Sequence, residues 1–301
     1  MKKKVSILLL SILVLMLGVP NKASAYTNSN WMGSLDNNTS ISKLSIPGTH
    51  DSGARYEPVY GTAKCQELPI SEQLNIGVRY LDIRCRHIND SFVIHHGSIY
   101  QHMNFDDVLN DCISFLDKNP TECIIMSVKE EYDASNNTES FEKTFDSYVA
   151  KTSNRWYLGS NIPTLNQARG KIVLVRRFSS NSSSKGINAT RWADNATFSI
   201  NNGYSQIKIQ DQYKVSNNDS KWSAIEALYN EAKLQNNNCL YINYTSGYKP
   251  MAFIPMIPKV SNDINSRVEN YFNQNSKGRF GITASDFIDN DISSKIISTN
   301  F

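Results

Sequence analysis

Two histidines in this 301-residue sequence lie at the ends of short apolar segments, where they could carry out chemistry. His50 follows the segment "KLSIPGT" and is itself followed by Asp51, while His96 ends "SFVIHH". Imidazole groups titrate near neutral pH, so a pair can remove one proton and deliver another in one reaction. A lone histidine more often serves only to satisfy hydrogen bonds. Two of them, accompanied by arginines and carboxylates at neighbouring segment ends, favour acid–base catalysis.

Two arginines and several aspartates occupy equivalent positions. Arg84 and Arg177 each end an apolar segment, and a guanidinium group can bind two oxygens of a phosphate at once. Alternatively, both could form ion pairs with Asp51, Asp82 or Asp211 and hold the segment ends together. The sequence contains no glycine-rich nucleotide loop and no H-E-x-x-H motif. Metal binding by the aspartates is conceivable, but a cation already placed among them can neutralise developing charge without a metal.

Eight short segments rich in β-branched and aromatic residues predict buried β-strands. They span residues 43–49, 78–84, 91–96, 123–129, 171–177, 206–211, 239–245 and 280–286. Strands that alternate with crossovers predict an α/β fold, a single distorted parallel (β/α)8 TIM barrel with some crossover helices missing or short. The active site of such a barrel lies at the C-terminal ends of its strands. Those ends carry His50–Asp51, Asp82, Arg84, His95–His96, Lys129, Arg177, Asp211, Asn243 and Asp286.

Apolar residues at helical spacing predict helices between some of these segments. The pattern is clear in residues 104–120, which end in Asn119-Pro120, and in residues 220–236, where Ser220 is the expected N-cap. It is weaker in residues 140–151. Residues 179–198 are polar and irregular, so we expect a long loop there rather than a separate domain.

The first 25 residues have the pattern of a secretory signal peptide: three lysines, a short apolar stretch and the small residues Ala23-Ser24-Ala25. A membrane anchor is the alternative, but the apolar stretch is shorter than the roughly 20 residues that a spanning helix needs. Removal of the segment and its four lysines takes the net charge from +3 to −1. We therefore expect a secreted, extracellular protein whose residues 26–301 form one catalytic domain, with no affinity for nucleic acid.

Five cysteines lie in the expected mature chain, at positions 65, 85, 112, 123 and 239. Their odd number and the lack of any C-x-x-C pair indicate neither a metal knuckle nor a disulfide framework. The cysteines are expected to be small buried residues, and a single bridge stays open.

Six motifs, taken in order, resemble the secreted bacterial phosphatidylinositol-specific phospholipases C. They are "SIPGTHDSG", "VRYLDIRCR", "VIHHG", "NPTECIIMSVKEEY", "ARGKIVLVRR" and "IQDQYKV", and the resemblance runs from about Trp31 to Ile288. It implies a distorted barrel that cleaves phosphatidylinositol in two stages. The inositol 2-hydroxyl first attacks phosphorus and releases diacylglycerol and inositol 1,2-cyclic phosphate, which is then slowly hydrolysed.

The resemblance also implies roles for individual residues. His50 matches the general base and Asp286 the carboxylate that orients it, although Asp289 and Asp291 lie close in sequence. His96 matches the general acid and Asp51 its supporting carboxylate. Arg84 matches the phosphate-binding arginine and Asp82 the acid beside it. Four further residues match positions that hold the inositol hydroxyls: Lys129, Arg177, Asp211 and Tyr213. Arg84 is typical of metal-independent members, so no metal and no cofactor are expected. His87 and His102 match no functional position.

An enzyme that acts on a bilayer lipid needs a reversible membrane contact. The segment 247–259, "GYKPMAFIPMIPK", follows the seventh strand and is predicted to be an apolar loop near the barrel mouth. Insertion into the membrane interface is the functional interpretation, and packing against the barrel is the alternative. A second candidate is segment 56–62, where relatives carry a tryptophan-bearing short helix. The expected contact residues are Tyr60, Met251, Phe253 and Ile254.

Two competing functions remain open from the residues alone. A glycerophosphodiester-type phosphodiesterase on a similar barrel would need divalent metal and a glutamate-rich ligand set. A catalytically silent lipid-binding module would tolerate loss of either histidine. The expected substrate is phosphatidylinositol, and whether proteins with glycosyl-phosphatidylinositol (GPI) anchors are also substrates stays open. The expected oligomeric state is a monomer.

Overall fold

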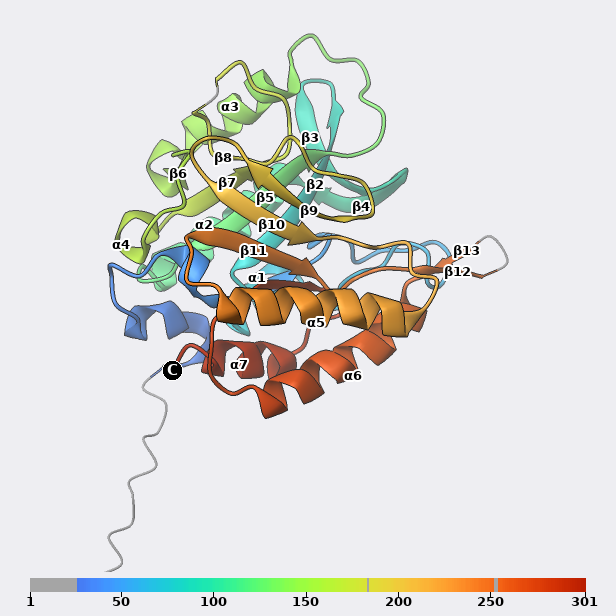
Figure 1. Ribbon diagram of the computed structural model, residues 1–301. Coiled ribbons are helices and arrows are strands. Elements are labelled where there is room, and N and C mark those ends of the chain that lie inside the picture. The colour runs from blue at the N-terminus through green and yellow to red at the C-terminus, as the bar shows by residue number, and fades with distance from the viewer. Residues whose placement is uncertain (1–25, 183, 252–253) are drawn as a thin grey trace, which may run out of the picture.

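The computed structural model of the protein describes residues 26–182, 184–251 and 254–301 (Figure 1). Its main feature is a curled, twelve-stranded sheet with helices on its outer side. Seven strands in the middle of this sheet are parallel, in the order β7-β5-β2-β1-β14-β11-β10. Their bounds are β1 Ser45–Thr49, β2 Tyr80–Ile88, β5 Ile124–Glu130, β7 Ile172–Arg176, β10 Gln206–Gln210, β11 Cys239–Tyr244 and β14 Gly281–Ser285. Each corresponds to one of the apolar segments of the sequence, and the predicted distorted barrel is confirmed.

The eighth predicted segment has a different structure. β3 (Ser91–His96) pairs antiparallel with the end of β2 and with β4 (Ile99–Asn104), so its assignment as a parallel barrel strand was wrong. The cause is a two-residue turn at Asn89 and Asp90, whose φ angles of 51° and 54° are those of a tight hairpin turn. The hairpin carries His96 back over the mouth of the barrel.

The two ends of the sheet account for the distortion. At one end, β6 (Trp156–Tyr157) and β8 (Ile187–Asn188) pair with successive parts of the outer edge of β7. At the other end, β9 (Thr197–Asn201) runs antiparallel to β10. Among the described residues, no ladder joins these two ends. β8 and the start of β9 lie in the segment that was expected to be a loop.

The helices cover the outside of the sheet. In Figure 1, α5, α6 and α7 lie side by side below the strands, and α5 contacts β11 while α7 contacts β1. The bounds are α1 Ile70–Asn75, α2 Phe105–Lys118, α3 Phe141–Lys151, α4 Leu165–Ala168, α5 Asn218–Leu234, α6 Pro258–Gln274 and α7 Asn290–Ser298. Three 3₁₀ helices, η1 Asn28–Ser34, η2 Ile41–Lys43 and η3 Ser153–Arg155, and a hairpin of β12 (Lys249–Met251) and β13 (Ile254–Met256) complete the fold. None of the described helices is long and apolar enough to cross a membrane.

The helices predicted at 104–120, 140–151 and 220–236 are confirmed, with one change. α5 begins three residues earlier than Ser220 would allow, because the side chain of Asn217 caps it by accepting from the backbone N–H of Asp219. The sequence pattern missed α6, whose first residue is the last proline of the "GYKPMAFIPMIPK" segment. Proline is tolerated at the first helical position because its missing N–H is not needed there.

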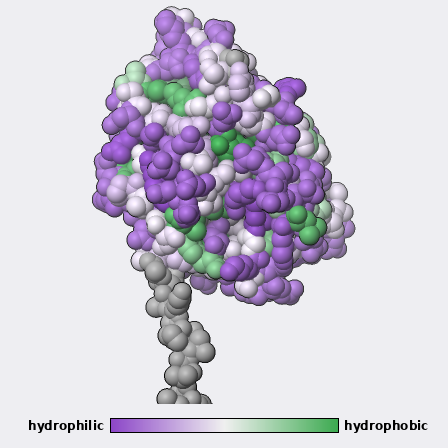
Figure 2. Space-filling model, turned by 60° about the vertical axis from the view of Figure 1, so that its left-hand side comes forward, coloured by the Kyte–Doolittle hydropathy of each residue, from purple (hydrophilic) through white to green (hydrophobic). Residues whose placement is uncertain are grey.

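Two hydrophobic clusters lie on opposite faces of the sheet. One lies between strands and helices, and the other lies inside the curled sheet. Successive strand residues alternate between them: Ile172 and Leu174 of β7 belong to the outer cluster, and Val173 and Val175 to the inner one. The five cysteines are all buried and unbridged. On the face drawn in Figure 2, hydrophobic residues form separate patches on a largely hydrophilic surface.

A fully buried ion pair joins η1 to the barrel. Nε and Nη2 of Arg79 donate to Glu122 Oε2 at 3.0 and 2.9 Å, and both side chains are wholly buried. Glu122 also accepts from the backbone N–H groups of Met32 and Gly33. Removal of either partner would leave the other charge buried and unpaired.

We expect Glu122→Ala to lower the free energy of unfolding by about 3–5 kcal/mol, because Arg79 would lose its counter-charge in the interior. Urea denaturation measures the change. Glu139→Ala is the matched control, because Glu139 forms an exposed pair with Lys143 whose loss should cost below about 1 kcal/mol. Equal losses in both variants would contradict the prediction.

Candidate active site

The alternation of the strands places the polar residues at their ends inside the barrel. Interior positions in β7, for example, are 173 and 175, and the next in phase is Arg177. The same count along each strand leads to the end residues that share this phase: His50 after β1, Asp82 and Arg84 in β2, Lys129 in β5, Asp211 after β10 and Asp286 after β14. A cavity of about 1100 Å³ opens at these ends and is lined by most of them.

His50 is held by Asp286. Nδ1 of His50 lies 2.7 Å from Asp286 Oδ1, while Nη2 of Arg84 donates to its Nε2 at 2.8 Å. Because a guanidinium group can only donate, Nε2 must be the unprotonated nitrogen and Nδ1–H must donate to the carboxylate. Burial and the charge of Arg84 both lower the pKa of His50. The charge and the hydrogen bond of Asp286 raise it by more, so the pKa is raised overall. His50 is thereby set up as a base whose Nε2 faces the cavity.

The structure distinguishes Asp286 from its neighbours in sequence. Asp289 caps α7 by accepting from the backbone N–H of Ile292, and Asp291 lies in the first turn of that helix. Neither takes part in the pair with His50, so the ambiguity that the sequence left is resolved in favour of Asp286.

Arg84 lies at the centre of a group of carboxylates. Its Nη2 donates to Asp82 Oδ2 at 3.2 Å, and its Nε lies 3.7 Å from Asp51 Oδ2. Nη1 lies 3.8 Å from Glu131 Oε1. Burial would raise the pKa of Asp82, but Arg84 and then Arg177 outweigh it and hold that pKa well below its usual range. The arginine side chain is 14 % exposed, so it is fixed by anions behind it while it still faces the cavity.

His96 is the second imidazole of the cavity. Its Nδ1 lies 2.8 Å from the carbonyl oxygen of Ala63 and 3.4 Å from Asp51 Oδ2. The neighbouring His95 is buried and its Nδ1 lies 3.3 Å from the carbonyl of Gly97, so only His96 faces the cavity, as strand alternation requires. Asp51 has a φ of 38°, a conformation that non-glycine residues seldom adopt, and burial raises its pKa against the effect of Arg84 and His96.

The other predicted residues line the wider part of the cavity. Nζ of Lys129 forms a 2.6 Å pair with Glu131, and burial followed by the charge of Arg84 lowers the pKa of this lysine. Arg177 lies 3.4 Å from Asp82 on one side. On its other side, its guanidinium carbon lies 3.8 Å from the ring centre of Trp192. Asp211 and Tyr213 also line this part of the cavity.

Three further residues belong to the site and were not predicted. Glu131 holds Lys129 and could have been found, because it continues the interior phase of β5 by two positions. Trp192 stacks on Arg177 and donates to Asp211 Oδ2 at 2.9 Å. It lies in an irregular segment whose pattern gives no signal. Cys65 has its Sγ 3.6 Å from His96 Nδ1.

The proposed membrane segments lie beside each other near the cavity. The backbone N–H of Ile257 donates to the carbonyl of Gly61, and a side chain at Gly61 would meet the sulfur of Met256. Tyr60 is 69 % exposed and Ile254 is partly exposed. The segment 247–259 is therefore a short hairpin leading into α6 rather than a loop. Met251 ends β12, and the predicted contact at Phe253 lies outside the described residues.

The fold and this site define an α/β-barrel whose mouth holds two histidine–carboxylate pairs around an arginine that faces the cavity. Residues 44–178 match the family model described as phosphatidylinositol-specific phospholipase C, X domain. A 1-phosphatidylinositol phosphodiesterase of Staphylococcus aureus is 35 % identical, with 100 % of both chains covered, and one of Listeria monocytogenes is 29 % identical, covering 92 % of this chain and 86 % of the relative. A solved S. aureus phosphatidylinositol-specific phospholipase C superposes with a TM-score of 0.83, at 34 % identity and with 91 % and 98 % of the two chains covered. The chain belongs to the family of bacterial phosphatidylinositol-specific phospholipases C.

Proposed function

We propose that the protein cleaves phosphatidylinositol into diacylglycerol and inositol 1,2-cyclic phosphate, and then slowly hydrolyses the cyclic ester. The observation that carries this proposal is the placement of Arg84, which lies between the His50–Asp286 pair and the His96–Asp51 pair. A phosphate bound to Arg84 would have an imidazole available for each of the two proton transfers. Family membership supports the same substrate.

The first proton transfer is assigned to His50. Its unprotonated Nε2 accepts the proton of the inositol 2-hydroxyl as that oxygen attacks phosphorus. The nucleophile belongs to the substrate, so the ring closes with the high effective concentration of an intramolecular reaction. Asp286 faces the positive charge that develops on the imidazole, and Arg84 faces the negative charge on the phosphate oxygens.

The second proton transfer is assigned to His96, which protonates the leaving glycerol oxygen. Because Nδ1 is hydrogen-bonded to the carbonyl of Ala63 and lies 3.4 Å from Asp51, Nε2 is the nitrogen available to the substrate. The carboxylate of Asp51 faces the charge of the protonated ring. In the second stage, the roles reverse, with His96 activating water and His50 protonating the 2-oxygen. Lys129, Arg177, Asp211 and Tyr213 hold the inositol hydroxyls in this proposal, and Trp192 fixes the plane of Arg177.

Phosphorus NMR of the purified protein with phosphatidylinositol vesicles in EDTA tests the proposal. We expect the resonance of a five-membered cyclic phosphate, followed slowly by that of a monoester. Vesicle binding without turnover would favour the silent lipid-binding module. Activity that requires added calcium or magnesium would favour the metal-dependent glycerophosphodiester-type enzyme and would overturn the assignment of Arg84.

We further propose that the protein is secreted after cleavage behind Ala25, acts as a monomer and also cleaves GPI anchors. The pattern of residues 1–25, which lie outside the described structure, supports secretion. The open cavity of about 1100 Å³ supports room for an anchor glycan. Sequencing of the exported protein should begin at Tyr26, light scattering should give the mass of one chain, and vesicles should release a GPI-anchored reporter. A different result in any one assay removes that proposal alone.

Membrane contact is proposed for the joined surface of Tyr60 and the β12–β13 hairpin; solved structures of the S. aureus relative concern modulation of its membrane binding. We expect Tyr60→Ala and Ile254→Ala each to weaken binding to phosphatidylinositol-containing vesicles about fivefold. The reason is that each substitution removes apolar side-chain surface that would be buried in the membrane, and this loss costs ~1 kcal/mol of binding free energy. Sedimentation with sucrose-loaded vesicles measures the change. Leu234→Ala is the control, because Leu234 is 80 % exposed at the end of α5, and an equal effect there would contradict the assignment.

A further inference from the structure

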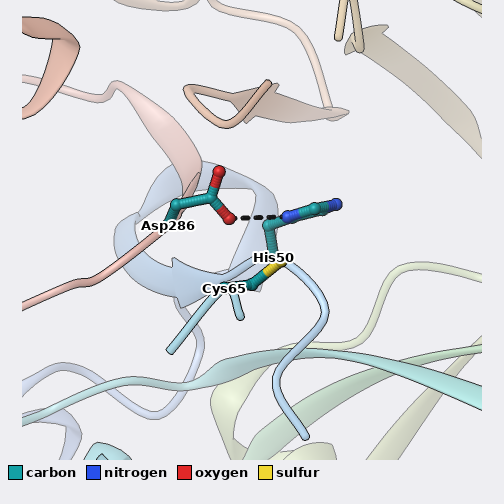
Figure 3. A group of neighbouring side chains, drawn as sticks. All are labelled: His50, Cys65 and Asp286. Atoms are coloured by element: carbon teal, nitrogen blue, oxygen red, sulfur yellow. Dashed lines mark hydrogen bonds and ion pairs between the residues drawn. The ribbon is translucent and has the colours of Figure 1, made fainter. Parts of the chain in front are cut away.

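Cys65 lies between the two histidine–carboxylate pairs, and the proposed reaction makes no use of it. Figure 3 shows its side chain beside the hydrogen-bonded His50 and Asp286. Its sulfur is wholly buried and lies 3.6 Å from Nδ1 of His96. The backbone fixes this position, because Cys65 donates to the carbonyl of Ala54 and accepts from the N–H of Phe287.

A second observation points to a cation at the same place. Asp51 is wholly buried, and among the described residues neither of its carboxylate oxygens has a hydrogen-bond partner. Its Oδ2 lies 3.4 Å from Nδ1 of His96, and the ligand atoms of Asp51, Cys65 and His96 all lie within 4.8 Å of one another. A buried carboxylate that lacks hydrogen-bond donors favours a directly bound cation, which Arg84 does not supply because its Nε stays 3.7 Å from Oδ2.

We propose that Cys65, His96 and Asp51 bind a thiophilic divalent cation of the Zn²⁺ class, and that this cation inhibits the enzyme. The binding is independent of the proposed function, whereas the inhibition rests on it. A thiolate, an imidazole and a carboxylate are the three protein ligand types that zinc accepts.

Both separations from His96 Nδ1 fit one tetrahedral ion. Zinc bonds of about 2.3 Å to sulfur and about 2.0–2.1 Å to nitrogen and oxygen place neighbouring ligand atoms about 3.4–3.6 Å apart. The observed distances from His96 Nδ1 are 3.6 Å to Cys65 and 3.4 Å to Asp51. Nδ1 would exchange its contact with the Ala63 carbonyl for the metal. The His96 side chain is 23 % exposed and lines the cavity, so a cation would reach the buried Cys65 and Asp51 past this ring.

The alternative set, His50, Cys65 and Asp286, also lies within 4.8 Å but fits less well. Its nitrogen and oxygen are 2.7 Å apart, as a hydrogen bond requires and closer than two ligands of one zinc ion. Two effects oppose binding at the proposed set. Burial, followed by the charges of Asp286 and Asp51, raises the pKa of Cys65, so the ion must displace a firmly held proton. Arg84, 3.7 Å from Asp51, adds a competing positive charge.

Inhibition follows from the nitrogen that is used. A ring that coordinates a metal through Nδ1 keeps its Nε2 proton more tightly than an imidazolium does. His96 would then be a poor proton donor to the glycerol oxygen. The cation would also neutralise Asp51, which otherwise faces the protonated ring.

The experiment is a titration of the metal-free protein, residues 26–301, with Zn²⁺ by calorimetry and with Co²⁺ by absorption. We expect one equivalent to bind and a near-ultraviolet thiolate-to-cobalt band to appear. Cys65→Ser and Asp51→Asn should each weaken binding by at least about tenfold, since loss of even an outer-shell partner of a metal site lowers its affinity about 10- to 100-fold. Cys239→Ser, at another buried cysteine, should bind as the wild type does.

Zn²⁺ should inhibit cyclic phosphate formation over the same concentration range in which it binds. The rate of the Cys65→Ser variant is compared with its own rate in EDTA, and its inhibition should need at least about tenfold more Zn²⁺. Cobalt binding without the thiolate band, or equal binding to wild type and Asp51→Asn, would overturn the site even if Cys65→Ser failed to fold. Binding with the band but without inhibition would overturn the inhibition alone. Neither binding readout requires turnover, so an inactive protein in EDTA would count against the proposed function and not against the site.

Discussion

His50→Ala is expected to lower the rate of cyclic phosphate formation by about 10³-fold, within the range of about 10²–10⁴ that general acid–base groups contribute. The variant loses the imidazole ring that links Asp286 to Arg84 and whose Nε2 is assigned as the base. Binding of phosphatidylinositol vesicles should change little, because the loss affects the proton transfer and not the membrane contact. Initial rates by phosphorus NMR, with separate vesicle sedimentation, measure both quantities.

His102→Ala is the matched control. His102 lies on β4 against the ring of Tyr56, outside the cavity, and its loss should leave the rate within about twofold of the wild type. A drop in the rate of less than tenfold for His50→Ala, or equal drops in both variants, would contradict the assignment of the base.

The role of Asp286 gives a sharper readout than the size of a rate loss. Its charge raises the pKa of His50, and the base must be unprotonated to act. In Asp286→Asn that pKa falls, so the acid limb of the kcat/KM profile should move to lower pH while its plateau drops. A purely structural role for the carboxylate would lower the plateau without moving the limb.

Strand phase explains why most of the site could be predicted from the sequence. In a parallel barrel the C-terminal ends of the strands meet at one mouth, and alternate residues point inside. The apolar segments alone therefore predict that Arg84, Lys129 and Arg177 share one cavity. The same count would have found Glu131, two residues beyond Lys129.

The errors arose where the chain leaves the parallel pattern. The predicted segments 78–84 and 91–96 are separated by six residues, 85–90, which is too short for a parallel crossover of about a dozen residues. In the structure β2 continues to Ile88, and Asn89 and Asp90 form the hairpin turn. Trp192 could not be predicted, because an irregular segment without periodicity carries it to Arg177. α6 was missed because the prolines that precede it argue against a helix, yet the last of them begins one.

Charge around Arg84 accounts for how one site can hold several buried carboxylates. Asp51, Asp82 and Glu131 all face this guanidinium. Burial alone would raise the pKa of Glu131. The positive charge of Arg84, followed by that of Lys129, lowers this pKa to about 2. The carboxylates in turn fix the plane of the guanidinium, so that Nη2 points at His50. In the proposed reaction a substrate phosphate would therefore meet a donor that is already oriented, which is the form of preorganisation that stabilises developing charge.

Arg84→Ala is accordingly expected to lower the rate of cyclic phosphate formation by about 10³-fold or more, since loss of a single preorganised donor typically costs about 10²–10³. Arg84→Lys should recover less than about tenfold of this loss, because an ammonium group cannot reproduce the planar contacts to Asp82, the phosphate and His50 together. Initial rates in EDTA measure the effect, and thermal melts show whether each variant is folded.

Arg86→Ala is the matched control on the same strand. Arg86 has the same strand phase as Arg84 but lies outside the cavity, where it donates to the carbonyl of Asp133 and stacks on Tyr132. Its loss should leave the rate nearly unchanged. Arg84 also lowers the pKa of His50, so in Arg84→Ala the acid limb of kcat/KM should move to higher pH, opposite to its movement in Asp286→Asn. If the acid limbs of Arg84→Ala and Asp286→Asn moved in the same direction, the two residues would not act on one imidazole. The assignment of His50 as the shared base would then fail.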